Sequence, residues 1–176
     1  MFLNPSEIIK NFELRRGMTV ADFGSGSGHY VLETARRIGN TGTVYAVDIQ
    51  KNLLEKIKTE AGKNNLTNVE IVWADLEGPE GSRLASGAVD FLVISNILFQ
   101  LRDKIGLARE ASRVLKSGGR AAVIDWSESG TGGLGPAPSA VVAQKEAERI
   151  FTQEGFTEER EFPAGSNHYG LIFRKQ

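Results

Sequence analysis

Cysteine is absent from this chain of 176 residues. Its absence excludes disulfides, thiolate metal sites and a cysteine nucleophile, and it suits a reducing compartment. Long apolar runs are also missing, since none approaches the ~20 residues that a membrane-spanning helix needs, and the N-terminus lacks a basic region followed by an apolar stretch. We therefore expect a cytoplasmic protein with no membrane span, and we predict no metal site.

An excess of charge of one sign is lacking as well. The chain has 21 Lys and Arg residues against 22 Asp and Glu residues, and the two signs are interleaved. Nucleic acids are bound by clustered basic residues, so nothing here supports a nucleic-acid partner. A chain of this length suits one domain with a single core, which we expect to span residues 1–176.

Apolar runs with strand character alternate with amphipathic helical segments. Strands are predicted at residues 19–23, 43–47, 69–74, 89–95, 120–125, 156–162 and 169–174. Helices are predicted at residues 30–38, 52–61, 101–115 and 139–154. This alternation implies a doubly wound, Rossmann-like α/β fold, with a mainly parallel seven-stranded sheet and a C-terminal antiparallel hairpin. Ligands bind such sheets at the carboxyl ends of the strands.

The N-terminal segment, residues 1–18, contains a helix start. Asn4 can cap the helix, Pro5 occupies its first position and Glu7 stands three residues after the cap. We expect a short helix that ends near Phe12.

Glycines mark two other segments. Residues 116–119, with the sequence KSGG, indicate a glycine C-cap for the helix before them. Residues 127–138 contain four glycines and show no periodicity. This composition predicts a flexible loop over the reactive edge of the sheet.

A glycine-rich turn follows the first predicted strand. Residues 22–30 read DFGSGSGHY, and the glycines allow a ligand to come close to the backbone. A dinucleotide fingerprint would need its third glycine at position 29, where the chain has His29. Asp22 would repel a pyrophosphate, whereas it would attract an ammonium or a sulfonium. A tight turn that binds no ligand is the alternative.

Two further aspartates stand at predicted strand ends. Asp48 ends the second strand, where it can accept hydrogen bonds from both hydroxyls of a ribose; the alternative is a cap for the following helix. Asp75 ends the third strand, where it can accept from the amine of an adenine lodged between Ile49 and Leu76. Three acidic side chains beside one glycine turn form a joint signal for a single ligand.

These motifs resemble those of class I S-adenosylmethionine-dependent methyltransferases. The likeness is carried by VADFGSGSG at residues 20–28, VYAVDI at 44–49, WADL at 73–76, DFLVISN at 90–96 and RVLKSGGR at 113–120. The order of these motifs is most similar to the branch that methylates quinones and other small molecules. The resemblance implies S-adenosylmethionine as the cofactor and S-adenosylhomocysteine as its product.

The same resemblance implies a set of cofactor-binding residues. Asp22 and the glycines would face the methionine part, Asp48 the ribose and Asp75 the adenine amine. The residues expected to contact the cofactor are Asp22, Phe23, Gly24, Ser25, Gly26, Gly28, Tyr30, Asp48, Ile49, Ala74, Asp75, Leu76, Ser95 and Asn96. The sequence SNIL at 95–98 departs from the Asn-Pro-Pro-Tyr type of motif in amino-methylating DNA enzymes.

The activity implied by the resemblance is methyl transfer to a small-molecule acceptor by in-line displacement. Positioning and exclusion of water can drive such a reaction without a general base. Candidates for a catalytic role are Asp125, Trp126 and His29, whereas His168 is expected to be structural. The alternatives are a noncatalytic S-adenosylmethionine-binding or regulatory module, a methyltransferase acting on RNA or protein, and a nicotinamide oxidoreductase.

Little chain remains outside the predicted cofactor core. Only residues 1–12 and 127–138 are left to cover the reactive edge, although the acceptor must be held in line and shielded from water. We therefore expect a homodimer or a partner protein to complete the acceptor pocket. The apolar residues on those segments that can form the contact are Phe2, Leu3, Ile8, Ile9, Phe12 and Leu134.

Overall fold

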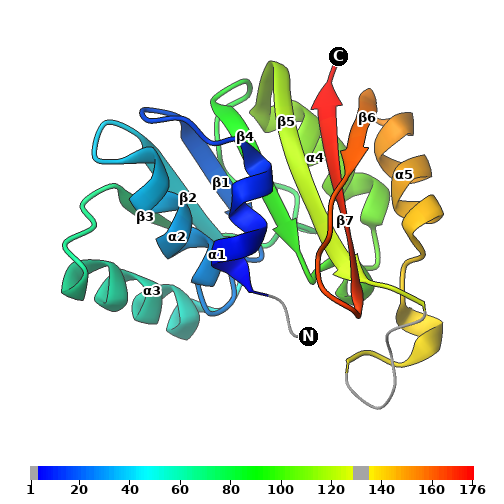
Figure 1. Ribbon diagram of the computed structural model, residues 1–176, viewed down its shortest axis with the longest axis horizontal. Helices are drawn as coiled ribbons and strands as arrows, with labels where there is room; N and C mark the ends of the chain where they lie inside the picture. The colour runs from blue at the N-terminus through cyan, green and yellow to red at the C-terminus, as the bar shows by residue number, and fades with distance from the viewer. Residues whose placement is uncertain (1–3, 129–134) are drawn as a thin grey trace.

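A computed structural model of the protein describes residues 4–128 and 135–176. Seven strands form one sheet in the order β3-β2-β1-β4-β5-β7-β6 (Figure 1). Strands β1 to β5 run parallel to one another, and β7 is antiparallel to both β5 and β6. The strands are β1 Thr19–Phe23, β2 Thr43–Asp48, β3 Val69–Trp73, β4 Val89–Ser95, β5 Leu115–Trp126, β6 Phe156–Glu161 and β7 His168–Lys175. The predicted fold class, including the antiparallel pairing of the last two strands, is confirmed.

Helices cover both faces of this sheet (Figure 1). On the face toward the viewer lie α1, α2 and α3, and their buried side chains join one apolar cluster. On the other face α4 and α5 join a second cluster. The helical elements are α1 Pro5–Ile8, η1 Ile9–Phe12, α2 His29–Ile38, α3 Lys51–Lys63, η2 Leu98–Gln100, α4 Lys104–Val114, η3 Pro138–Ala140 and α5 Gln144–Gln153.

Strand β4 lies at the centre of the sheet and is buried on both faces. Phe91 and Val93 belong to the cluster with α2 and α3, whereas Leu92 and Ile94 belong to the cluster with α4 and α5. A strand that packs on both faces needs apolar side chains at successive positions, which explains the nearly continuous apolar run in this segment. The predicted bounds of this strand, 89–95, are confirmed.

The N-terminal helix is shorter than predicted. Only Pro5–Ile8 is α-helical, and a 3-10 turn continues to Phe12. The predicted capping by Asn4 is wrong, since its side chain accepts a hydrogen bond from the Ser6 hydroxyl and caps no backbone group, while Glu7 pairs with Lys10. Four residues cannot complete more than about one α-helical turn, so the segment depends on tertiary contacts.

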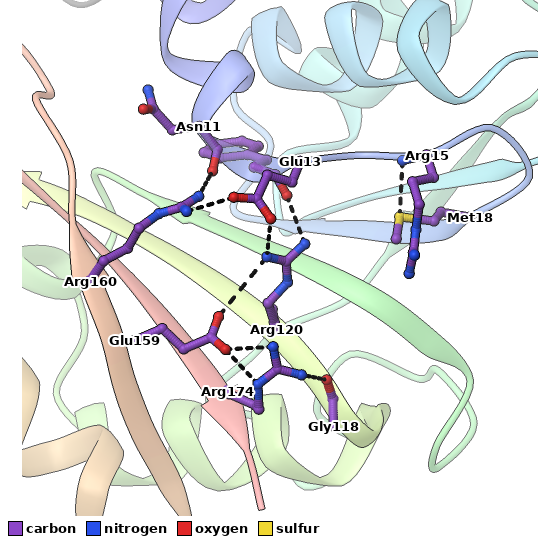
Figure 2. Close-up of polar contacts among 10 residues, drawn as sticks. Asn11, Glu13, Arg15, Met18, Gly118, Arg120, Glu159, Arg160 and Arg174 are labelled. Carbon is purple, nitrogen blue, oxygen red and sulfur yellow. Dashed lines mark hydrogen bonds and ion pairs between the residues drawn. The ribbon is translucent and has the colours of Figure 1, made fainter.

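Those tertiary contacts are shown in Figure 2. Glu13 has a left-handed backbone (φ 53°), and its carboxylate pairs with Arg120 at 2.9 Å and with Arg160 at 2.6 Å. Arg120 also donates to the Phe12 carbonyl, and Arg160 donates to the Asn11 carbonyl. Hydrogen bonds from Arg160 and then from Arg120 lower the pKa of Glu13 to about 2. The end of the N-terminal segment is thus tied to β5 and β6.

Two other predicted boundaries are wrong for identifiable reasons. Helix α4 begins at Lys104 because the Asp103 carboxylate accepts from the Gly106 N–H at 2.7 Å, and residues 98–100 form a separate 3-10 turn. The KSGG segment does not cap α4, which ends at Val114 and passes directly into β5. Gly118 adopts φ +72° where the β4–β5 register shifts between Val89 and Phe91, so these glycines form an irregularity within the strand.

The last helix starts later than predicted, at Gln144, after a 3-10 turn at Pro138–Ala140. Residues 129–134, the greater part of the predicted flexible loop, lie outside the described residues, as do Phe2 and Leu3. Within the ranges that the structure describes, no helix is long and apolar enough to cross a bilayer.

Candidate functional site

A cavity of about 730 Å³ opens at the carboxyl ends of β1, β2, β3 and β4. This is the edge at which open α/β sheets bind ligands. The residues that line the cavity are Pro5, Asp22, Gly24, Ser25, Gly26, Ser27, His29, Tyr30, Asp48, Ile49, Gln50, Ala74, Asp75, Leu76, Glu77, Ser95, Asn96, Ile97, Gln100 and Leu101.

The three glycines of the turn after β1 share a left-handed backbone, and two of them have distinct roles. All three adopt a positive φ, +74° at Gly24, +50° at Gly26 and +80° at Gly28. A Cβ at Gly28 would lie 2.5 Å from the side chain of Ile57, so this glycine permits α2 to pack on α3. At Gly26 the nearest atom would be 3.8 Å away, which leaves the backbone open to the cavity.

Asp48 joins the end of β2 to the glycine turn. One carboxylate oxygen accepts from the Gly26 N–H at 2.8 Å, and the other accepts from the Gln50 N–H at 2.8 Å. A carboxylate offers about four acceptor positions, so further hydrogen bonds can form on the cavity side. The side chain is buried and lines the cavity. This geometry suits a ligand with adjacent hydroxyls.

Asp22, at the end of β1, has a different environment. Its side chain is 3% exposed, and among the described residues none donates a hydrogen bond to its carboxylate. Burial, and then the negative charge of Asp48, raise the pKa of Asp22 to about 7. A cation placed in the cavity would favour the ionised carboxylate.

Apolar side chains line the opposite end of the cavity, near β3. Ile49 is 57% exposed and lines the cavity together with Leu76, while the Asp75 carboxylate accepts one hydrogen bond, from the Glu77 N–H at 3.0 Å. The Trp73 indole donates to the Ile49 carbonyl at 3.0 Å and so fixes the backbone beside this apolar pair. Two apolar walls with an acceptor at the rim suit a planar ring that carries an amine.

Three residues that line the cavity have buried hydroxyls with no hydrogen-bond partner among the described residues. They are Ser25, Tyr30 and Ser95. Burial raises the pKa of Tyr30, and the nearby Ser95 hydroxyl opposes part of that rise. Buried polar groups are normally satisfied, so these hydroxyls indicate a polar ligand. With the carboxylates and the open glycine backbone, they fit the nucleoside and amino-acid parts of S-adenosylmethionine.

The structure brings together most of the residues predicted to contact the cofactor. All of them line the cavity except Phe23 and Gly28. Phe23 is fully buried in the cluster with α4 and α5, on the opposite face of the sheet from α2. Gly28 serves the packing of α2, as described above.

The three catalytic candidates are placed differently. His29 lines the cavity. Asp125 is fully buried and accepts from the Leu98 N–H at 2.9 Å and from the Trp126 N–H at 2.8 Å; burial raises its pKa to about 6, against the effect of these hydrogen bonds. Trp126 is half-buried, and its ring lies 4.3 Å from that of His168. Neither Asp125 nor Trp126 lines the cavity.

Sequence reasoning missed several lining residues. Ser27, Gln50 and Ile97 adjoin predicted contact residues along the chain, so a wider window around each motif would have included them. Gln100 comes from the 3-10 turn that the sequence pattern merged with the following helix. Pro5 reaches the cavity because the N-terminal segment folds back over the sheet, for which the sequence carries no local signal.

Comparison with known proteins adds family relationships to this geometry. Residues 14–162 match the model of a family described as a methyltransferase domain. The chain is 34% identical over 116 residues to the ubiquinone/menaquinone biosynthesis C-methyltransferase UbiE of Klebsiella pneumoniae, covering 65% of this chain and 45% of that protein. It is 28% identical over 122 residues to a demethylmenaquinone methyltransferase of Staphylococcus aureus, covering 69% and 48%. The chain thus spans about half the length of these curated relatives.

A solved structure is similar over almost the whole chain. The crystal structure of an S-adenosylmethionine-dependent methyltransferase from Aquifex aeolicus superimposes with a TM-score of 0.86 at 28% sequence identity. The match covers 98% of this chain and 90% of that one.

Proposed function

Since the chain belongs to the methyltransferase-domain family and is a class I S-adenosylmethionine-dependent methyltransferase, we propose that its acceptor is a small molecule with an oxygenated ring, of the quinol class. The observation that supports S-adenosylmethionine as the cofactor is the row of side chains along one sheet edge, from Asp75 past Asp48 and Asp22 to Asn96. Relatives that are named for the methylation of quinone precursors support the acceptor class.

The residues in this row match successive parts of the cofactor. Asp75 is proposed to accept from the adenine amine, with Ile49 and Leu76 against the two faces of the ring. Asp48 is proposed to accept from the ribose hydroxyls, and Asp22 to pair with the ammonium group. When bound, S-adenosylmethionine supplies a methyl group activated by a sulfonium.

The order of the strands then assigns the acceptor to one side. With the adenine toward β3 and the methionine part toward β1, the reacting end of the cofactor faces β4 and β5. Asn96 and Ile97 line the cavity on that side. Because methyl transfer from a sulfonium is an in-line displacement, we propose that these residues act by holding the acceptor in line and by excluding water. Asp125 is buried and engaged by backbone N–H groups, so it is not assigned the role of a base.

Two measurements test this proposal. Calorimetric titration should show binding of S-adenosylmethionine and S-adenosylhomocysteine and none of NAD. Radiolabelled S-adenosylmethionine should transfer its methyl group to 1,4-naphthohydroquinone and not to amines or thiols of similar size. Cofactor binding without transfer to any acceptor in such a panel would instead favour a noncatalytic module.

Closure of the acceptor side is a separate proposal. Of the residues described in the N-terminal segment and in 127–128 and 135–143, only Pro5 lines the cavity. We propose that a second copy of the chain or a partner protein completes the acceptor pocket. Solution mass with and without cofactor, and turnover at dilute and concentrated protein, test the idea. A strict monomer with full activity at every concentration would contradict it.

A further inference from the structure

Asn96 occupies an unusual position at the end of β4. Its backbone adopts φ +56°, which is uncommon for a residue other than glycine. Three hydrogen bonds hold it: its N–H donates to the Ile124 carbonyl at 2.9 Å, its carbonyl accepts from the Gln100 side chain at 2.7 Å, and its side-chain oxygen lies 2.8 Å from Nε2 of His168. Strained conformations persist where the surroundings overdetermine them, and they concentrate at functional sites.

His168 fixes which end of the Asn96 amide faces the cavity. It begins β7 directly opposite Trp126 on β5, with the two rings 4.3 Å apart. The imidazole is half-buried, and burial lowers its pKa, so the ring is neutral near pH 7. An amide oxygen only accepts hydrogen bonds, so Nε2 of His168 carries the proton and donates it to Asn96.

This contact leaves the amide nitrogen of Asn96 without a protein acceptor among the described residues, although the residue lines the cavity. Building on the proposed function, we infer that the Asn96 NH2 group donates a hydrogen bond to an oxygen of the methyl acceptor. His168 occupies one acceptor position of the side-chain oxygen and orients the amide, so the group that has no partner in the described part of the chain is the NH2 donor. Asn96 therefore selects oxygen-bearing acceptors such as phenols, enols and carbonyls, and His168 is a positioning residue that acts through it.

Substitution of the amide tests the donor. Asn96→Asp keeps the shape and the oxygen that faces His168, but replaces the NH2 group with an oxygen that only accepts. With 1,4-naphthohydroquinone as the probe, we expect the KM to rise about 10-fold or more, because a donor is lost and a repulsive oxygen replaces it. The rise in KM should exceed any change in the Kd for S-adenosylhomocysteine, which is measured alongside because Asn96 lines the same cavity. Asn65→Asp is the matched control, since Asn65 also has a left-handed backbone (φ 54°) and lies away from the cavity.

Substitution of the imidazole tests the positioning role. His168→Gln can still donate to the Asn96 oxygen, and His168→Leu cannot. We expect the KM of the probe to stay close to that of the unaltered chain in the first variant and to rise in the second, with cofactor affinity retained in both. Equal KM values in the two variants would overturn the positioning role.

The protonation of His168 offers a readout that does not depend on turnover. The chain has only two histidines, so in a 15N-labelled sample the ring signals absent from His168→Gln belong to this residue. The inference requires protonated Nε2 and unprotonated Nδ1 near pH 7, and the opposite tautomer would overturn it.

The outcomes separate this inference from the proposed function. If the unaltered chain methylates the probe and Asn96→Asp leaves its KM unchanged, the donor role is wrong and the proposed function stands. If the unaltered chain methylates no acceptor, the proposed function is wrong. In that case saturation-transfer NMR of the probe with protein loaded with S-adenosylhomocysteine still decides the contact, because binding should be lost in Asn96→Asp.

Discussion

Two aspartates in one cavity show how the surroundings of a side chain set its chemistry. Asp48 receives two backbone N–H donors at 2.8 Å, while Asp22 receives no hydrogen bond from a described residue and has its pKa raised to about 7 by burial and by Asp48. Backbone donors stabilise an ionised carboxylate before any ligand binds. A buried carboxyl without such donors needs a nearby cation, such as one on the ligand, to favour its ionised form. The pair therefore offers one fixed acceptor and one group that responds to charge.

Replacement of the fixed acceptor should weaken cofactor binding. Asp48→Asn removes the charge while keeping the shape, so we expect the affinity for S-adenosylhomocysteine to fall by about 1.5 to 3 kcal/mol, the usual range for hydrogen bonds to a charged group. Calorimetry measures the change. Asp90→Asn is a matched control, because the Asp90 carboxylate also accepts a backbone N–H at 2.8 Å and lies outside the cavity. Unchanged affinity in folded Asp48→Asn would reject the ribose assignment.

The raised pKa of Asp22 predicts how stability depends on pH. Between the unperturbed value of 3.8 and the folded value of about 7, the folded state holds a proton that the unfolded state has lost. Stability without ligand should therefore fall as pH rises through this window, an effect of about 1.4 kcal/mol for each pKa unit at most. Denaturant unfolding between pH 5 and pH 8 should show that the free energy of unfolding declines more steeply with pH in the unaltered chain than in Asp22→Asn. Parallel curves would contradict the raised pKa.

At the scale of elements, the N-terminal segment is attached by two kinds of contact of unequal strength. Phe12 is fully buried and packs against Phe91 and Tyr30, with ring centroids 5.1 and 6.1 Å away, whereas Glu13 forms its ion pairs in an exposed position. Removal of a buried aromatic ring costs about 3 to 5 kcal/mol, and exposed ion pairs contribute about 0.2 to 1 kcal/mol each. Burial of Phe12 should therefore dominate the attachment.

Unfolding by denaturant tests this ranking. Phe12→Ala should lower the free energy of unfolding by about 3 to 5 kcal/mol, and Glu13→Gln, which removes two ion pairs, by no more than about 2 kcal/mol near neutral pH. The pKa of Glu13 is lowered in the folded state, so its contribution is present above pH 4.5 and is lost as pH falls toward 2. A greater loss from Glu13→Gln than from Phe12→Ala would show that the ion pairs, and not the ring, hold the segment.

The elements that could be predicted from the sequence are those whose pattern is local. Strand β4 was predicted with its correct bounds because burial on both faces requires a continuous apolar run. The end of α4 could not be predicted, since the glycines at 118–119 read like a helix cap but serve an irregularity in β5. The N-terminal helix is likewise cut short by the contacts of Glu13, whose partners lie more than 100 residues away.

The features of the candidate site also divide into those that a local pattern predicts and those that depend on distant contacts. The acidic side chains and the glycine turn were predictable because each adjoins a strand end, and parallel strands end at one edge. The contact between Asn96 and His168, 72 residues apart, was not predictable, because it depends on β7 lying antiparallel between β5 and β6. Because β7 runs opposite to β5, the first residue of β7 lies at the sheet edge where the parallel strands end.

At the scale of the whole molecule, the ligand cavity and the ion pairs that attach the N-terminal segment occupy different parts of the sheet. The cavity collects residues from the carboxyl ends of four parallel strands, while the ion pairs of Figure 2 join Glu13 to Arg120 in the middle of β5 and to Arg160 on β6. Residues of the cavity come from positions 5 to 101 of the chain, so only the folded chain brings them together. A ligand of this cavity should therefore bind the folded state and not the unfolded state.

This exclusive binding predicts thermal stabilisation by the correct ligand. A ligand that binds only the folded state at 100 times its Kd stabilises it by about 2.7 kcal/mol, which for a domain of this size raises the Tm by roughly 5 to 11 °C. S-adenosylhomocysteine should produce such a shift, and NAD at the same concentration should not. At one fixed subsaturating concentration the shift should also be larger at pH 8 than at pH 6, because Asp22 is then ionised and can pair with the ligand ammonium. Equal stabilisation by NAD would contradict the cofactor assignment, whereas a shift independent of pH would leave the cofactor in place and reject the pairing with Asp22.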